Sequence, residues 1–168
     1  MGSLQFNLDE IFELAEQIER NGARFYRRAA EILVDEQAVR LLTDLAAMED
    51  EHEQTFQSLR ANLVKEEWRE ERAWETDEHA LYLQAMGDQA VFDVRVDPLQ
   101  RLTGVTSLQE VLTLAIGLEK ESIAFYVGLQ KLTRPQRGRE EIDRILEEEI
   151  KHVVTLNRVR ALLGEAKA

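Results

Sequence analysis

The sequence EQIERNGARFY (residues 16–26), followed by MEDEHE (48–53), decides the fold of this chain. Matching segments follow about 100 residues later, AIGLEKESIAFY (115–126) and EEEIKH (147–152). In each copy a single Glu is followed, 30 residues further on, by a Glu-x-x-His motif. The repeated residues are Glu19, Glu49 and His52 in the first copy and Glu119, Glu149 and His152 in the second. Because their offset stays at 100 residues, the repeat indicates duplication of one structural unit.

The Glu-x-x-His motifs fall on apolar stripes with helical spacing. Residues three apart lie on one face of a helix, so both side chains of a motif can reach the same point. Glu49 and His52 interrupt the stripe formed by Leu45, Met48 and Phe56, and the second motif interrupts a similar stripe. The motifs are therefore predicted to point into the core of a helical bundle.

Four long helical patterns predict an all-α fold, a four-helix bundle in one domain spanning residues 1–168. Capping boxes at Asn7–Glu10 and Ser107–Glu110 mark the start of the first and third helices. We expect one antiparallel hairpin at about 8–70 and another at about 107–163. The 72–106 segment between them is too long for a structureless loop in a compact domain, so it is predicted to cross over along the bundle.

The buried carboxylates predict a metal centre. A charged carboxylate inside a core costs several kcal/mol, on the order given for buried charge, unless it is paired or bound to metal. Two lone Glu and two Glu-x-x-His motifs form the ligand pattern of four-helix bundles that hold two iron or two manganese ions. Four carboxylates also balance two divalent cations. Oxygen-rich ligands with one imidazole per ion favour two Fe ions, with Mn or Zn as alternatives.

Tyr26 and Tyr126 follow Glu19 and Glu119 by seven residues, two helical turns along the same face. Two roles are open for these side chains. A tyrosine there can hydrogen-bond a ligand carboxylate or carry an electron, and would then belong to the catalytic site. Alternatively, both rings pack in the core with a satisfied hydroxyl group.

The composition excludes several classes of protein. A formal charge of −12 repels phosphate backbones and anionic lipid, so neither nucleic acid nor a membrane is an expected partner. The absence of Cys rules out disulfides, thiolate zinc and iron–sulfur clusters within the chain. The sequence has no signal-peptide core and no apolar run of transmembrane length, and we expect a cytoplasmic location.

The four quoted segments resemble the rubrerythrin-like branch of the ferritin-like superfamily, from about residue 8 to residue 163. The resemblance implies a ferritin-like bundle, a di-iron site made of the six repeated residues, and reaction with O2 or H2O2. It also suggests a homodimer. Rubrerythrins proper add a rubredoxin-like module, whose iron is held by four cysteines and which feeds in electrons, so any electron donor here is expected to be separate. Ser122 stands where they carry an additional Glu.

We therefore expect an oxidoreductase of the ferroxidase or peroxidase type, in which the bound metals supply the redox chemistry. Two alternatives stay open. The chain can instead be a non-catalytic iron-binding or iron-handling protein, in which metal occupancy stabilises the fold. It can also be a structural helical bundle, which would keep its stability after all metals are removed.

Overall fold

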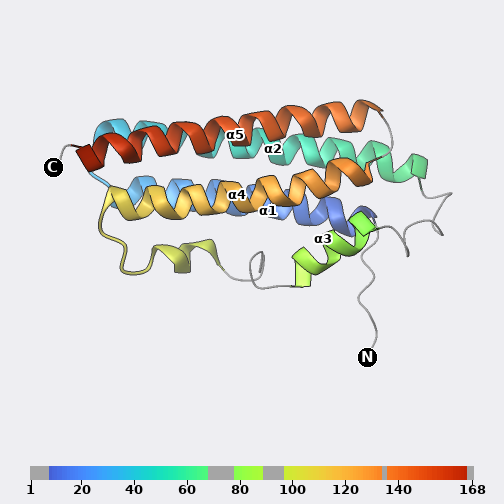
Figure 1. Cartoon of the computed structure of the whole chain (residues 1–168), viewed down its shortest axis with the longest axis horizontal. Helices are drawn as coiled ribbons and strands as arrows, with labels where there is room; N and C mark the ends of the chain where they lie inside the picture. The colour runs from blue at the N-terminus through green and yellow to red at the C-terminus, as the bar shows by residue number, and fades with distance from the viewer. Residues whose placement is uncertain (1–7, 68–77, 89–96, 134–135, 166–168) are drawn as a thin grey trace.

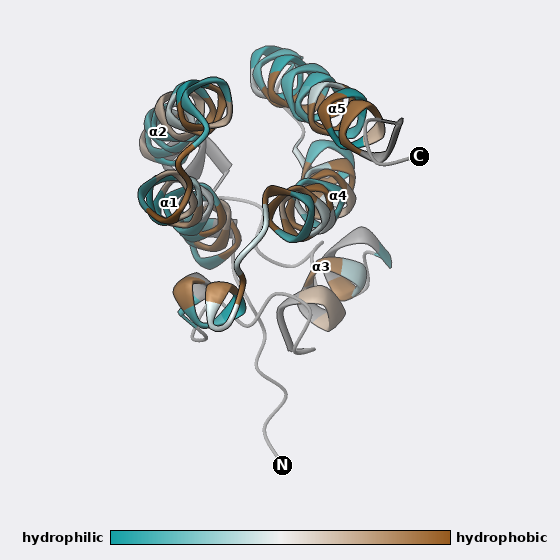
Figure 2. Cartoon of the chain, turned by 90° about the vertical axis from the view of Figure 1, so that its left-hand side faces the viewer, coloured by the Kyte–Doolittle hydropathy of each residue, from teal (hydrophilic) through white to brown (hydrophobic). Residues whose placement is uncertain are grey.

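The computed structural model describes residues 8–67, 78–88, 97–133 and 136–165, and these ranges contain helices and no strand. Four long helices form the bundle: α1 (Leu8–Ile32), α2 (Glu36–Glu67), α4 (Leu108–Leu132) and α5 (Gln136–Glu165). Seen along its axis, α1 and α2 stand side by side opposite α4 and α5 (Figure 2). Each pair is an antiparallel hairpin (Figure 1). The predicted four-helix bundle is confirmed.

Local sequence explains two of the helix starts. The Ser107 hydroxyl accepts a hydrogen bond from the Glu110 N–H (3.3 Å), and the Glu110 carboxylate accepts one from the Ser107 N–H (3.1 Å), which confirms the predicted capping box. Asp35 accepts from the Ala38 N–H at 2.7 Å and so begins α2. Such side chains satisfy N–H groups that have no partner within the helix. The box predicted at Asn7 lies outside the described residues.

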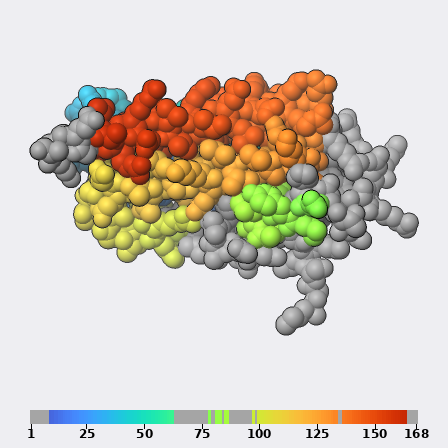
Figure 3. All heavy atoms as spheres, viewed as in Figure 1, coloured from blue at the N-terminus to red at the C-terminus, as the bar shows by residue number. Residues whose placement is uncertain are grey.

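Two short helices belong to the connection between the hairpins, α3 (Glu78–Asp88) and η3 (Pro98–Leu102). α3 packs on the outside of α4 (Figure 3). There the Tyr82 hydroxyl donates to the Ala124 carbonyl at 3.0 Å. η3 lies towards the other end of the bundle, where Arg24 of α1 pairs with Asp97 at 3.1 Å. α3 and η3 therefore lie at different places along the length of the bundle (Figure 1), as the predicted crossover requires.

The apolar interior consists of two groups of buried side chains. Core one is centred on Phe12, Phe56 and Phe125, with Leu83 of α3 added to it. Core two is centred on Phe25, Leu42, Leu112 and Leu156, with Leu102 of η3 added to it. On each long helix the predicted ligands lie between a residue of core one and a residue of core two. The polar site is thus closed at both ends by hydrocarbon.

None of the described helices is both long and apolar enough to span a lipid bilayer.

Candidate metal centre

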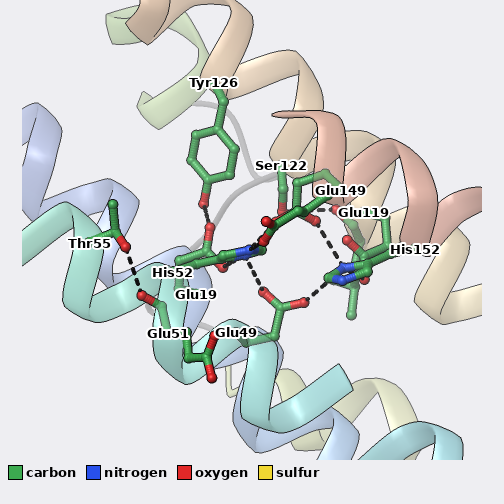
Figure 4. Close-up of polar contacts among 12 residues, drawn as sticks. Glu19, Glu49, Glu51, His52, Thr55, Glu119, Ser122, Tyr126, Glu149 and His152 are labelled. Atoms are coloured by element: carbon green, nitrogen blue, oxygen red, sulfur yellow. Dashed lines mark hydrogen bonds and ion pairs between the residues drawn. The ribbon is translucent and has the colours of Figure 1, made fainter. Parts of the chain in front are cut away.

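All six repeated residues converge in the middle of the bundle, where each side chain is almost completely buried (Figure 4). We call them the carboxylate–histidine cluster: Glu19 of α1, Glu49 and His52 of α2, Glu119 of α4, and Glu149 and His152 of α5. Their relative exposures run from 0% to 4%. By contrast Glu51, two residues from Glu49, is exposed. Helical periodicity therefore separates the candidate ligands from neighbouring surface carboxylates, as expected.

The cluster divides into two overlapping sets of four potential ligands. One set contains Glu19, His52, Glu49 and Glu149; the other contains Glu119, His152, Glu49 and Glu149. Within each set the ligand atoms lie within 4.8 Å of one another. Glu49 and Glu149 belong to both sets, so their carboxylates could contribute ligands to either ion. The geometry therefore provides two adjacent metal positions with two shared carboxylates.

Both imidazoles turn Nδ1 towards the interior of the cluster. His52 Nδ1 lies 2.9 Å from Glu149 Oε1 and 3.5 Å from Glu19 Oε2. His152 Nδ1 lies 3.5 Å from Glu49 Oε1 and 3.5 Å from Glu119 Oε1. The same arrangement is thus repeated about an approximate two-fold axis that relates the two hairpins.

Many oxygen and nitrogen atoms of the cluster that could bind a metal have no hydrogen-bond partner of acceptable geometry. They include one or both carboxylate oxygens of Glu19, Glu49 and Glu149, and Nδ1 of both histidines. A buried polar atom without a partner costs roughly 1–3 kcal/mol, and more when it is charged. A metal ion in each set would satisfy these lone pairs at once. The residues present therefore fit a dinuclear metal site.

In the metal-free cluster, the pKa values of several buried carboxyl and imidazole groups are raised, so these groups retain protons. Burial raises the pKa of Glu149 to about 8, helped by the negative charge of Glu119. Burial also raises the pKa of Glu49 well above its usual range, with further effects from Glu149 and Glu19. Burial by itself lowers the pKa of His52, but the close Glu149 and Glu19 carboxylates outweigh it and raise the value to about 11. The cluster therefore holds protons tightly where a cation would otherwise compensate the buried negative charge.

The two tyrosines act across the bundle. The Tyr26 hydroxyl of α1 donates to Glu119 of α4, and the Tyr126 hydroxyl of α4 donates to Glu19 of α1. Each thus holds a carboxylate oxygen of the opposite hairpin, as Figure 4 shows for Tyr126. Because burial raises the pKa of both hydroxyls well above the usual range, they stay protonated and remain donors. The sequence left two roles open for these tyrosines. In the structure, both hydroxyls hydrogen-bond a candidate ligand carboxylate.

One contact of the cluster is absent from the sequence prediction. His52 Nε2 lies 2.7 Å from Glu148 Oε2, on the outer side of the imidazole ring. Glu148 stands in a run of three glutamates, 147–149, so residue type gives no signal that separates it from its neighbours. Only the placement of α5 beside α2 identifies it. Ser122, by comparison, donates to the Leu118 carbonyl of its own helix at 3.2 Å.

Comparison with known proteins agrees with this geometry. The family model described as Rubrerythrin matches residues 2–60. A solved structure from Thermotoga maritima, described as a "putative ferritin-like diiron-carboxylate protein", superposes with a TM-score of 0.70 at 21% sequence identity. The alignment covers 94% of this chain and 96% of that one. A search of characterised proteins gives no significant match. The predicted resemblance is confirmed: residues 2–60 are similar to the Rubrerythrin family, and the chain has a ferritin-like fold.

Proposed function

We propose that this protein binds two iron ions in the carboxylate–histidine cluster and uses them to reduce O2 or H2O2. One observation carries the proposal: two buried ligand sets, each with three carboxylates and one imidazole, share Glu49 and Glu149. Oxygen-rich sites with a single imidazole and no sulfur suit iron, with manganese or zinc as the alternatives. The Thermotoga maritima relative is itself described as a diiron-carboxylate protein, which supports the same metal.

Charge supports two ions rather than one. Four carboxylates converge in the cluster, and they carry a charge of −4 when all are ionised. Two divalent cations neutralise that charge, whereas one would leave two negative charges in a water-poor interior. Since uncompensated buried charge is strongly unfavourable, double occupancy is the more stable loaded state.

When bound, two ferrous ions supply two electrons, which with two protons reduce H2O2 to two water molecules or O2 to H2O2. The chain's own residues prepare the site for that exchange. Glu49 and Glu149 keep the two positions adjacent, and the imidazoles complete each set. The hydroxyls of Tyr26 and Tyr126 fix the orientation of two carboxylates. Cores one and two keep bulk water away from both ends.

A repeated reaction needs a source of electrons. The chain contains no Cys, so it carries no thiolate-bound iron centre of its own. We propose that a separate donor re-reduces the metals, while in its absence the protein performs a single ferroxidase turnover. The homodimer and the cytoplasmic location expected from the sequence stay predictions.

A non-catalytic iron-binding role is the competing proposal, because the crowded carboxylates also favour metal-dependent stability. The two proposals differ in what happens after loading. Anaerobically loaded protein should form ferric iron faster than free Fe2+ does when mixed with O2 or H2O2, and it should react a second time only after a reductant is added. A binding protein would hold its ions without accelerating the oxidation of added Fe2+.

The decisive experiment follows ferric absorbance after rapid mixing, in the wild type, Glu149→Ala and Glu51→Ala. Glu149→Ala should lose both bound iron and oxidation, whereas Glu51→Ala, altered at an exposed position, should behave like the wild type. Comparing O2 with H2O2 at equal concentration then identifies the preferred oxidant. If all three proteins oxidise Fe2+ at the rate of free iron, the proposed activity is wrong.

A further inference from the structure

We propose that the two metal positions are not equivalent, and that Glu148 is a positioning residue that makes the position at His52 the tighter one. The inference deepens the proposed metal binding and rests on it. It comes from a break in the internal two-fold symmetry, on the outer side of the two imidazole rings.

The ring of His52 is held from both sides. Its Nδ1 points into the cluster, 2.9 Å from Glu149 Oε1, while its Nε2 lies 2.7 Å from Glu148 Oε2. An outer carboxylate accepts the Nε2 proton and so fixes the ring orientation in which Nδ1 faces the cluster, where an ion would displace the Nδ1 proton and take its lone pair. His52 is therefore oriented as a metal ligand before any ion arrives.

The ring of His152 lacks the corresponding partner. Its Nδ1 also points into the cluster, 3.5 Å from Glu49 Oε1 and Glu119 Oε1. Its Nε2 is buried and has no hydrogen-bond partner among the described residues. The 100-residue offset that relates His52 to His152 also relates Glu148 to Met48, and a thioether is only a weak acceptor.

This difference should act on one ion more than on the other. Outer partners of ligating histidines typically change metal affinity by about 10–100-fold, because they orient the ring and raise its basicity. The Glu148 side chain is 43% exposed, so solvent weakens the contact and the lower part of that range is expected. The shared carboxylates Glu49 and Glu149 cannot produce the asymmetry, since both positions use them.

The test is anaerobic titration with Mn2+, followed by calorimetry and by electron paramagnetic resonance. Calorimetry resolves the two binding steps, and the spectrum distinguishes a single bound ion from a magnetically coupled pair. The variants are Glu148→Ala, Glu148→Gln and Met48→Glu. Glu147→Gln is the matched control, because it alters an exposed glutamate next to Glu148 on the same helix. Circular dichroism establishes that each variant is folded.

The wild type should bind two Mn2+ in steps at least about 10-fold apart in affinity. Glu148→Ala should weaken the first step by about 10-fold or more and leave the second within about 3-fold, so that the steps merge. Glu148→Gln keeps an acceptor without the charge, so its affinity for the first Mn2+ should lie between those of the wild type and Glu148→Ala. Met48→Glu should strengthen the weaker step, and Glu147→Gln should match the wild type.

Three results would overturn the inference. Two identical steps in the wild type would show equivalent positions, with the proposed metal binding intact. An equal loss at both steps in Glu148→Ala would show a general structural effect instead of positioning. If folded Glu148→Ala binds both Mn2+ ions with wild-type affinities, Glu148 has no positioning role. Failure of the wild type to bind any Mn2+ or Fe2+ is a different result, since it would contradict the proposed function itself.

Discussion

The two hairpins of this protein are alike inside the bundle and different on its surface. The interior positions that build the site carry the same residue types in both, including the tyrosine that crosses to the other hairpin. Towards the outside, Arg60 of α2 contacts three carboxylates of α1: Asp9 and Glu13 together with the buried Glu16. Arg160, its counterpart in α5, bonds only to Asn157 among the contacts described.

This contrast shows which constraints a metal site imposes. Two adjacent positions with shared bridging carboxylates require related geometry from both hairpins, so the interior repeats. Ion pairs on the surface contribute about 0–1 kcal/mol each, and they can differ between hairpins without affecting the site. Three departures are informative. Glu148, opposite Met48, and Gly22, opposite Ser122, lie beside the cluster, whereas Gly128, opposite Arg28, lies where α3 packs on α4.

The largest expected effect comes from removing a shared carboxylate. Glu49→Ala and Glu149→Ala should each lose both ions, because each residue belongs to both ligand sets. Glu19→Ala and Glu119→Ala should each lose one ion and keep the other. Elemental analysis of protein loaded with Fe2+ under anaerobic conditions measures the difference. Loss of one ion in Glu49→Ala and of two in Glu19→Ala would invert the assignment of bridging and terminal ligands.

The second prediction concerns pH and metal together. Folding raises the pKa of Glu149 from 4.5 to about 8, and that of His152 from 6.5 to about 9. For Glu149 burial is the cause; for His152 burial acts in the opposite direction but is outweighed by Glu119 and Glu149. The folded state therefore binds these protons more tightly than the unfolded state does. The resulting stability is complete at low pH and is lost as pH rises through the folded-state values.

Metal-free protein should accordingly unfold at a lower temperature at about pH 8.5 than at about pH 6. Bound metal replaces the protons, so loading should raise the midpoint more at the higher pH. The hairpins should also differ, since the pKa of His52 is raised to about 11 and that of His152 to about 9. Thermal unfolding, with NMR titration of the imidazoles, measures both effects. A metal-free protein whose midpoint rises with pH would contradict this electrostatic description.

The sequence predicted that the six side chains of the cluster converge because they break an otherwise regular apolar pattern. Glu49 and His52 stand on a helical stripe that must face a core, and the fixed offset to the second copy identifies their partners. The helical repeat thus encodes which residues meet. The same reasoning gives the antiparallel hairpins and the crossover, because short connections and one long one permit few alternatives.

The contact between Glu148 and His52 depends on how α5 is rotated and shifted against α2, which no local pattern records. The same holds for the tyrosines: their spacing places them near the site, but only the packing of α1 against α4 shows that each bonds the opposite hairpin's carboxylate. The sequence predicts the position of α3 least well, since α3 is placed on α4 by close contacts at Gly128. Contacts between helices are the part that sequence periodicity leaves open.

The tyrosines allow the symmetry of the interior to be measured. Tyr26→Phe and Tyr126→Phe each remove a hydrogen bond to a buried carboxylate while keeping the ring. Each should reduce the free energy of unfolding by about 1.5–3 kcal/mol, the range for hydrogen bonds to charged groups. Chemical unfolding of both variants, loaded with the same metal, gives the values. Two near-neutral substitutions would show that the rings matter only for packing.

Gly128 tests how α3 is attached to the second hairpin. An added Cβ at this position would lie 2.8 Å from a carbon of Leu83 and 2.8 Å from a ring carbon of Tyr82. Gly128→Ala should therefore displace α3, at a cost of about 1–3 kcal/mol for overpacking, partly offset by about 1 kcal/mol of helix propensity. Hydrogen exchange of α3 should become faster while the metal stoichiometry stays at two. Arg28→Ala, at the exposed counterpart in α1, is the control and should leave α3 unchanged.

The smallest expected change in stability occurs at Gly22, where the hairpins differ closest to a shared carboxylate. A Cβ at Gly22 would lie 3.3 Å from the Glu49 carboxylate carbon and 3.3 Å from its Oε2, so that carboxylate would have to move by a few tenths of an ångström. The gain of about 1 kcal/mol in helix propensity opposes this crowding, and unfolding should stay within about 1 kcal/mol of the wild type.

Metal binding should respond to Gly22→Ala more than stability does, because Glu49 belongs to both ligand sets and a shift of its carboxylate disturbs both positions. We expect both Mn2+ affinities to fall together, by up to about 10-fold. Ser122→Ala, at the equivalent site of α4, removes only a 3.2 Å bond to the Leu118 carbonyl and should change neither stability nor affinity. Wild-type affinity in Gly22→Ala would mean that the Glu49 carboxylate has room to adjust, so that the glycine serves helix packing and not the metal site.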